Sequence, residues 1–376
     1  MLNRKLHILC FTVPYPANYG GVIDLFYMLP ALQKAGIRIH LHCFDYGRGK
    51  QDVLLSYCEK VNYYSRNRGH KGISSRLPYI VASRNNEQLI ENLLSDDAPI
   101  LMHGIHCSFL LTDKRFRDRN CHIRLHNTEY VYYHQLALDT SSWIKKIYYE
   151  IESRLLRKFE QQHASRASII AVAEQDISHY QEKFSCKHIQ HLPVFLPEWK
   201  VSGAEGMGNY CLYHGDLQVP SNEKAATLLL TKVFNKIQIP FVIAGRNPSD
   251  KLIALAHKSA HTCIVANPSD AEMEDMITRA HIHILPMMIP TGIQLKWLHA
   301  LYKGRHIVTL SNNIIWHPLA AAGYNAQSLD DLASLVTQLY HQPYTREEQI
   351  GREKLLQEIF NADRQAEQLI QIIFTS

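Results

Sequence analysis

Short apolar runs alternate along this chain with longer segments in which apolar residues recur every three or four positions. Runs of the first kind are typical of buried strands, and segments of the second kind are typical of amphipathic helices. In the first half, strands are predicted at residues 6–13, 37–44, 99–102, 122–126 and 168–172. Helices are predicted at residues 23–35, 85–94 and 142–166. This alternation predicts an α/β fold with a mostly parallel, doubly wound sheet, whose ligands bind beyond the carboxyl ends of the strands.

A stretch rich in glycine, proline and polar residues, PEWKVSGAEGMGN, interrupts the pattern. A second alternating series follows, with strands predicted at 210–214, 241–244, 262–266, 281–285 and 306–310 and a helix at 223–235. We therefore predict four parts: an N-terminal Rossmann-like domain at 1–196, a linker at 197–209, a C-terminal Rossmann-like domain at 210–345, and a helical segment at 346–376. Two such domains would face each other across a cleft, which suits an enzyme that holds two substrates.

Residues 285–310 run from an apolar strand through the turn Pro290-Thr291-Gly292 into an amphipathic helix and a second strand. A turn that leads into a helix leaves backbone N–H groups beside the positive end of the helix dipole, which is a common anion site. Gly292 would let the backbone approach a phosphate closely, and Lys296 could add a positive charge. The segment predicts a diphosphate-bearing ligand, although many α/β proteins use such a turn for packing only.

Composition narrows the class of protein. The chain has 376 residues, 46% of them hydrophobic and 20% charged, which suits two globular domains. No apolar stretch approaches the roughly 20 residues that span a bilayer, and residues 6–13 are too short for a signal peptide. Eight scattered cysteines without a CxxC pair indicate reduced thiols in a cytoplasmic protein. Among 22 histidines no HExxH motif occurs; His103 and His106 are the nearest metal candidate, and we expect no metal.

Charge is shared unequally between the two halves. Residues 1–200 hold 26 Lys+Arg and 19 Asp+Glu, a balance of 26 − 19 = +7, whereas residues 201–376 hold 14 and 16, a balance of −2. A basic, aromatic stretch lies at 143–149. This asymmetry fits contact with an anionic membrane surface or a lipid-linked phosphate, and a solvated basic face explains it equally well. The basic half has no recognised nucleic-acid module, so nucleic acid is not an expected partner.

Five motifs, in order along the chain, resemble those of GT-B glycosyltransferases of the family 4 type. They are Pro14-x-Pro16 with Gly20-Gly21, RLHNTEY at 124–130, YHGDL at 213–217 with Pro220-x-Asn222, VIAGRNP at 242–248, and TGIQLKWLHA at 291–300. The resemblance covers almost the whole chain. It implies two Rossmann-like domains facing a central cleft, the GT-B architecture, with the terminal helical segment packed back on the first domain.

The resemblance also implies a function. It implies transfer of a sugar from a nucleotide-diphosphate-sugar donor to a hydroxyl of a glycan or lipid-linked acceptor, with retention and without a metal or other cofactor. The setting would be bacterial cell-envelope polysaccharide synthesis, in the cytoplasm or peripherally at the inner face of the membrane. The implied site residues are catalytic His126 and Gly21; donor-binding Gly215, Gly245, Arg246, Thr291, Gly292, Ile293, Lys296 and His299; and acceptor-binding Gly20, Asn127 and Glu129.

Three departures from the family pattern affect nucleotide binding. His299 stands where the family has the glutamate that binds the ribose, and an imidazole cannot grip a vicinal diol as a carboxylate does. Asp216 lies in the loop where many relatives have an Arg/Lys pair, and Gln294 stands where relatives often have lysine. These departures favour one alternative, a non-catalytic GT-B homologue that acts as partner subunit of another glycosyltransferase. A second alternative is a different GT-B enzyme, such as a nucleotide-sugar epimerase.

Overall fold

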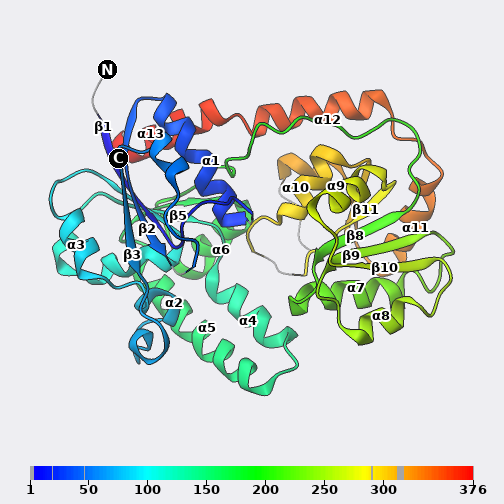
Figure 1. Cartoon of the computed structure of the whole chain (residues 1–376), viewed down its shortest axis with the longest axis horizontal. Helices are drawn as coiled ribbons and strands as arrows, with labels where there is room; N and C mark the ends of the chain where they lie inside the picture. Colours follow the sequence, from blue (N-terminus) through cyan, green and yellow to red (C-terminus); the bar gives the residue numbers. More distant parts are fainter. Residues whose placement is uncertain (1–3, 19, 46, 289–290, 311–316, 376) are drawn as a thin grey trace.

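A computed structural model describes residues 4–375 except 19, 46, 289–290 and 311–316. Two α/β domains lie side by side along the long axis of the molecule (Figure 1). Each has a parallel sheet with helices on both sides, so the predicted α/β fold class with two doubly wound domains is confirmed.

The N-terminal domain is built on a seven-stranded sheet with strand order β3-β2-β1-β4-β5-β6-β7. Its strands are β1 (Arg4–Cys10), β2 (Ile37–Asp45), β3 (Lys60–Ser65), β4 (Ile100–His103), β5 (Cys121–Leu125), β6 (Ser168–Ala171) and β7 (Ile189–His191). Its helices are α1 (Gly20–Lys34), α2 (Tyr79–Ala82), α3 (Glu87–Leu93), α4 (Glu129–Asp139), α5 (Trp143–His163) and α6 (Glu174–Phe184). The strand order reverses between β1 and β4, which is where such sheets bind ligands.

The C-terminal domain repeats the plan with six strands in the order β10-β9-β8-β11-β12-β13. The strands are β8 (Cys211–Asp216), β9 (Phe241–Arg246), β10 (Thr262–Ala266), β11 (Ile282–Ile284), β12 (His306–Leu310) and β13 (Tyr324–Ala326). The helices are α7 (Pro220–Lys232), α8 (Asp250–Ala256), α9 (Asp270–Arg279), α10 (Leu295–Lys303) and α11 (Leu329–Tyr340). Here the strand order reverses between β8 and β11, so α10, which follows β11, starts beside the switch point.

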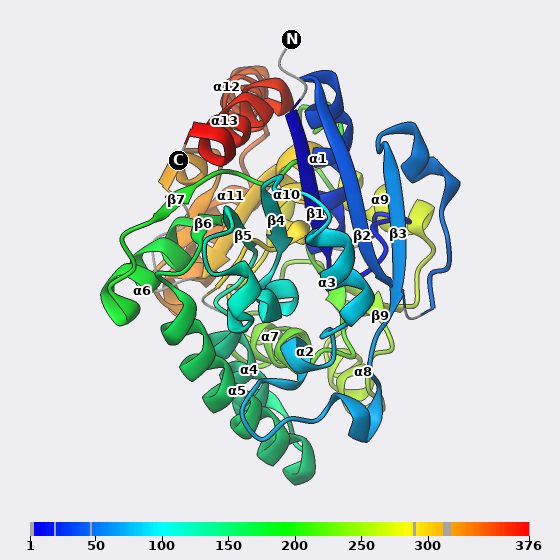
Figure 2. The same ribbon diagram turned by 90° about the vertical axis from the view of Figure 1, so that its left-hand side faces the viewer.

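The last two helices return toward the first domain. Helix α12 (Arg346–Ile359) runs along one edge of the molecule from the C-terminal domain, and α13 (Ala362–Thr375) ends beside α1 (Figure 1). Three apolar side chains of α13, Ala366, Leu369 and Ile373, are fully buried in a core cluster with residues of α1, β1 and β2. The final helix therefore completes the helical layer on one face of the N-terminal sheet. Figure 2 shows the molecule with the N-terminal domain toward the viewer.

The central strands are buried because they lie in parallel sheets covered on both faces, and they form near-continuous apolar runs. The strands that we did not predict are short or polar: β3 is half-exposed, and β7 and β13 have three residues each. No helix in the described part of the chain is long and apolar enough to cross a bilayer.

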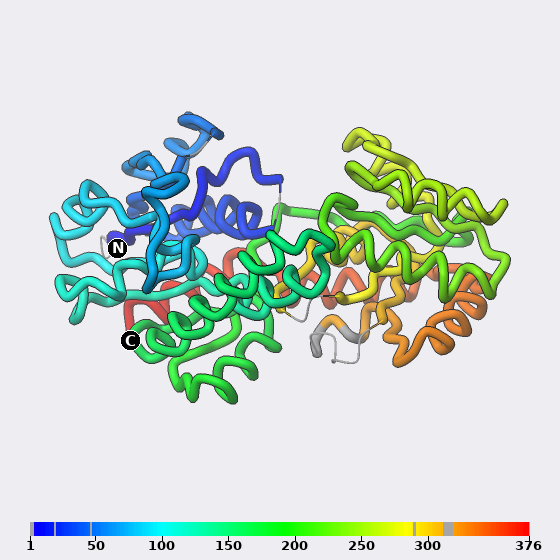
Figure 3. Tube along the Cα trace, turned by 90° about the horizontal axis from the view of Figure 1, so that it is seen from below, coloured from blue at the N-terminus to red at the C-terminus, as the bar shows by residue number. Residues whose placement is uncertain are grey.

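The domains also touch through helices on one side of the junction. Helix α4 runs toward α7 of the other domain (Figure 3). Lys224 on α7 donates to the buried carboxylate of Asp139 at the end of α4, with Nζ 2.8 Å from Oδ1.

Buried histidines make folding sensitive to acid. Burial lowers the pKa of His283 to about 3, whereas an unfolded chain titrates near pH 6.5. Below pH 6.5 the unfolded state therefore binds more protons, and stability falls as pH falls. We expect His283→Gln, which retains a donor for the Ile277 carbonyl, to reduce the stability loss between pH 7.5 and 5.0 by about 2 kcal/mol. Urea unfolding of both proteins at the two pH values measures this, and equal losses in both would contradict it.

Candidate functional site

The first wall of the candidate site is formed by the start of α1 and the end of β5. A Cβ atom on Gly21 would lie 3.0 Å from the Phe11 ring and 3.8 Å from Nδ1 of His126. A Cβ on Gly20 would lie 3.9 Å from Leu295, which belongs to the other domain. The structure thus brings Gly20, Gly21 and His126 together at the domain junction.

Asp24, on the buried side of α1, holds this wall in place. Its Oδ2 accepts from Nε of Arg124 at 2.9 Å and lies 2.8 Å from Nε2 of His126, while its Oδ1 accepts from Arg124 at 2.9 Å and from the Phe195 N–H at 2.8 Å. Burial alone would raise the pKa of Asp24, but Arg124 and His126 hold it well below its ordinary value. Asp24 is therefore ionised. Sequence reasoning missed this residue, whose signal is a carboxylate inside an apolar helical segment.

A second buried carboxylate, Asp176 on α6, joins the two domains. It accepts from Oγ1 of Thr128 at 2.7 Å, from Oγ1 of Thr291 at 2.5 Å and from the N–H of Gly292 at 2.9 Å. Gln175 adds a bond from its side-chain amide to the Gly292 carbonyl. The N–H that we predicted to meet a donor phosphate therefore donates to a carboxylate of the first domain. Asp176 was also missed, because Thr128 is 48 residues away and its partners in the second domain are 115 and 116 residues away.

Gly292 has a conformational reason to be glycine. Its φ is +67°, and a Cβ atom would lie 2.0 Å from Oδ1 of Asn127 and 2.6 Å from the carbonyl oxygen of His126. The predicted acceptor residue Asn127 and the predicted donor residue Gly292 are thus in direct contact across the junction, and Thr291 accepts a hydrogen bond from the N–H of Thr128, which follows Asn127. Ile293 follows and lines a small cavity with Gln175 and other neighbours.

Glu129 lies beneath the junction. Its side chain is buried, and its backbone N–H donates to Glu160. Burial, together with the Asp176 carboxylate, raises the pKa of Glu129 to about 7, and burial raises the pKa values of Glu160 and Asp176 as well. The side chain that we predicted to bind an acceptor is thus part of a buried acidic cluster behind Asn127.

The opposite wall of the candidate site carries the ammonium group of Lys296, which lies beside two neutral side chains. Nζ of Lys296 lies 3.0 Å from Oδ1 of Asn222, 3.3 Å from the Tyr213 hydroxyl and 4.8 Å from the centre of the Tyr213 ring. Burial lowers the pKa of Lys296 to about 8. A Cβ on Gly215 would be 3.3 Å from the Asn222 amide nitrogen. Lys296 and Gly215 therefore lie on either side of the Asn222 amide, whose nitrogen donates to the carbonyl of Asp216.

The other predicted donor residues lie in different settings. A Cβ on Gly245 would come 1.9 Å from the Gly215 carbonyl oxygen, so this glycine allows close packing of β8 and β9. Arg246 is 70% exposed and lies 3.9 Å from Asp270. The ring of His299 lies edge-on to Trp199 with centroids 4.7 Å apart. Asp216 accepts from the N–H of Gln218 in its own loop.

One group of side chains has the geometry to be tested as a metal site. Among the described residues, ligand atoms of Asp24, His103 and His126 lie within 4.8 Å of one another. Both Asp24 oxygens already accept from Arg124, whose charge would oppose a cation there. We therefore assign no metal to this cluster, and His106 is not part of it.

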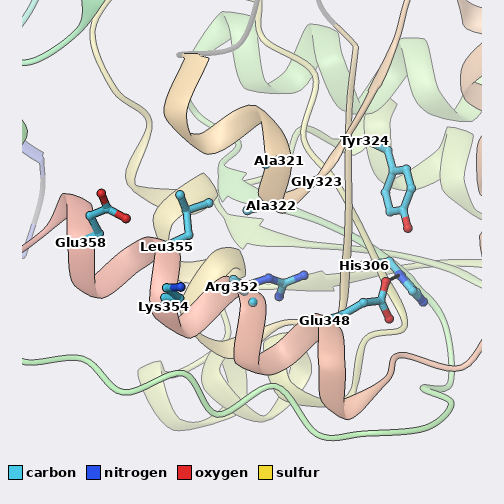
Figure 4. A pocket seen from close by; sticks show the side chains of 11 residues that line it. His306, Ala321, Ala322, Gly323, Tyr324, Glu348, Arg352, Lys354, Leu355 and Glu358 are labelled. Atoms are coloured by element: carbon cyan, nitrogen blue, oxygen red, sulfur yellow. Dashed lines mark ion pairs between the residues drawn. The ribbon is translucent and has the colours of Figure 1, made fainter.

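A larger cavity, of about 520 Å³, lies between α12 and the segment that leads into β13 (Figure 4). Its polar side chains are those of His306, Tyr324, Glu348, Arg352, Lys354 and Glu358. His306 begins β12 and Tyr324 begins β13, so the cavity lies near the amino ends of these strands. Arg352 donates to the carbonyls of Gly304 and Arg305 and thereby fixes α12 to the domain. The cavity is separate from the two walls described above.

No family model matches this chain. A protein of *Klebsiella pneumoniae* described as an uncharacterized 44.6 kDa protein in the cps region is 26% identical over 328 residues, which are 82% of this chain and 83% of that protein. Sucrose-phosphate synthase from *Thermosynechococcus elongatus* superimposes with a TM-score of 0.69 at 13% identity, covering 98% of both chains. The chain has the GT-B fold.

Two further solved structures share this fold. WaaG, a glycosyltransferase involved in lipopolysaccharide biosynthesis, matches with a TM-score of 0.62 at 12% identity, covering 98% of this chain and 100% of WaaG. HepE of Anabaena, solved in complex with UDP and glucose, matches with a TM-score of 0.62 at 11% identity, covering 99% of this chain and 100% of HepE. The predicted GT-B architecture is thereby confirmed.

The contact at Gly292 gives a direct test of the junction. We expect Gly292→Ala to lower the free energy of unfolding by about 2 kcal/mol or more, because it strains a positive φ and collides with Asn127. Gly351→Ala is the matched control: Gly351 is helical and a Cβ there meets nothing within 4 Å, so we expect a gain of up to about 1 kcal/mol. Urea unfolding measures both, and equal behaviour of the two variants would refute the tight junction.

Proposed function

We propose that this protein is a glycosyltransferase that moves a sugar from a nucleotide-diphosphate-sugar donor to a hydroxyl of a glycan or lipid-linked acceptor. The observation that carries the proposal is Lys296, a half-buried cation beside Tyr213 and Asn222, in the domain that packs against Gly20, Gly21 and His126. The GT-B fold supports it, because WaaG, which has this fold, is a glycosyltransferase and HepE, which also has it, was solved in complex with UDP and glucose.

In the proposed reaction the bond from the sugar C1 to the diphosphate oxygen breaks, and that oxygen keeps the electron pair. A bond forms from the acceptor oxygen to C1 with retention, and the hydroxyl proton passes to the departing diphosphate. Lys296 and the N-terminus of α10 would stabilise the developing charge without a metal. Because the Gly292 N–H donates to Asp176, Lys296 carries the larger share. Gly21, which adjoins His126, would lie beside the sugar.

The second candidate is a GT-B chain without transferase activity that serves as partner subunit of another glycosyltransferase. Two observations favour it: His299 packs on Trp199, and the carboxylate of Asp176 takes the N–H of Gly292. The two candidates differ in nucleotide binding, which the partner subunit would not need.

We further propose that the N-terminal domain contacts an anionic membrane surface from the cytoplasmic side. The α4–α5 hairpin exposes six large apolar side chains: Leu138, Trp143, Ile144, Ile147, Tyr148 and Ile151. Lys145 and Lys146 are exposed between them. Exposed apolar side chains interspersed with lysines suit an interface of lipid tails and anionic head groups. A lipid-linked acceptor would then reach the first domain from the membrane.

Nucleotide binding tests the transferase proposal. Calorimetric titration with UDP, GDP, ADP and dTDP should show that one of these nucleotides binds. The Lys296→Met change should lower the affinity for that nucleotide about 10- to 100-fold, because a charge-assisted hydrogen bond is lost. Affinity should also fall as pH rises from 7 to 9, since the free lysine, with its pKa of about 8, loses its proton.

The control is Lys258→Met, which removes an exposed lysine of the same domain and should leave affinity unchanged. If none of the four nucleotides binds at millimolar concentration, the hypothesis of a partner subunit replaces the hypothesis of a transferase.

Vesicle sedimentation tests the membrane contact. We expect the protein to bind vesicles that contain phosphatidylglycerol more than pure phosphatidylcholine vesicles, and Ile144→Glu with Ile147→Glu to reduce binding at least tenfold. Ile350→Glu is the matched control, since Ile350 is also about half exposed but lies on α12. Binding that the double change leaves intact would rule out contact through this hairpin.

A further inference from the structure

His126 has one ring nitrogen bound to Asp24 and one that lies beside Gly21, at the start of α1. Nε2 lies 2.8 Å from Oδ2 of Asp24, whereas Nδ1 lies beside Gly21, 3.8 Å from where a Cβ would be. The ring lies against two neighbours, with centroid distances of 5.2 Å to His103 and 6.4 Å to Phe11. Its orientation is therefore fixed by contacts on several sides.

The partner on the inner side determines where the proton of the neutral ring sits. Asp24 is ionised, and a carboxylate can only accept hydrogen bonds. The hydrogen between the two groups therefore belongs to Nε2, and Nδ1 is left with a lone pair. Asp24 cannot turn away, since each of its oxygens also accepts from Arg124.

Arg124 is itself fixed by hydrogen bonds to the segment that follows β7. Its guanidinium also donates to the carbonyls of Leu192 and Pro193, both at 2.7 Å. Gln365 on α13 donates to the carbonyls of Pro193 and Val194. The final helix thus supports the segment that anchors Arg124, which in turn orients Asp24.

We propose that Asp24 is a positioning residue: it holds His126 so that Nδ1 accepts a hydrogen bond from a hydroxyl group of a sugar bound at the junction. While the ring carries a single proton, an ionised phosphate oxygen cannot be the partner of Nδ1, because two acceptors cannot share a hydrogen bond. This inference rests on the proposed function for the identity of the ligand. It narrows the role of His126 from contact with either phosphate or sugar to contact with a hydroxyl.

The tautomer is measurable without any substrate. Two-bond proton–nitrogen spectra of ¹⁵N-labelled protein separate protonated from bare ring nitrogens, and the His126 signals are those lost in His126→Ala. We expect protonated Nε2 and bare Nδ1. In Asp24→Asn the amide can direct its NH₂ group to Nε2, and we expect the opposite tautomer. Asp96→Asn is the matched control, because Asp96 lies 3.0 Å from Nε2 of His7; it should change the His7 signals and leave those of His126 unchanged.

Transfer kinetics test the consequence. We expect Asp24→Asn to lower kcat about 10²-fold with little change in the donor KM, since misplacing one positioning group costs about that much. In a His126→Ala background the same change should cost nothing further, because Asp24 acts through His126.

Three outcomes would overturn the inference: a protonated Nδ1 in the neutral wild-type ring, a tautomer that Asp24→Asn leaves unchanged, or an undiminished effect of Asp24→Asn on kcat when His126 is absent. If no donor is turned over at all, the proposed function fails, and the spectra still decide whether Asp24 sets the tautomer.

Discussion

The carboxylate of Asp176 holds the two domains together at the point where they face each other. A buried carboxylate is costly unless donors surround it, and Asp176 is surrounded by the groups of Thr128, Thr291 and Gly292. Two of these belong to the second domain. The contact brings the end of β5 against the loop before α10, so His126 and Lys296 approach the same junction from opposite sides. Without it, the two walls of the proposed site would have no fixed relation.

Asp24 plays the corresponding part within the first domain. It ties α1 to β5 through Arg124 and to the segment after β7 through the Phe195 N–H. Removing one partner of such a buried pair is usually far more damaging than replacing both, because the remaining charge stays buried. The two carboxylates therefore have separate roles: Asp24 orients the side chain of His126, and Asp176 fixes the loop that precedes Lys296. Both act on residues that adjoin His126 in the chain or in space.

Much of the fold follows from the sequence pattern, because parallel strands buried on both faces leave continuous apolar runs separated by helical periods. The edge strands β3, β7 and β13 were not predicted, because half-exposed or three-residue strands do not form continuous apolar runs. Within the site, the motifs predicted that Gly21 and His126 lie together at the cleft and that Gly215 and Lys296 lie near one ligand group, and the structure places the members of each pair close together. They could not predict Asp24 or Asp176, whose partners lie about 50 to 170 residues away. Nor could they show that the N–H of Gly292 would bond to protein, because that depends on how the domains meet.

The central claim is that a nucleotide diphosphate binds between the two walls, on Lys296. The most direct measurement is a crystal structure of the protein with the nucleotide that it binds. The account predicts diphosphate oxygens within hydrogen-bonding distance of Nζ of Lys296, with the sugar end directed toward Gly21 and His126. A nucleotide found elsewhere, for example in the cavity beside Arg352 and Lys354, would contradict it.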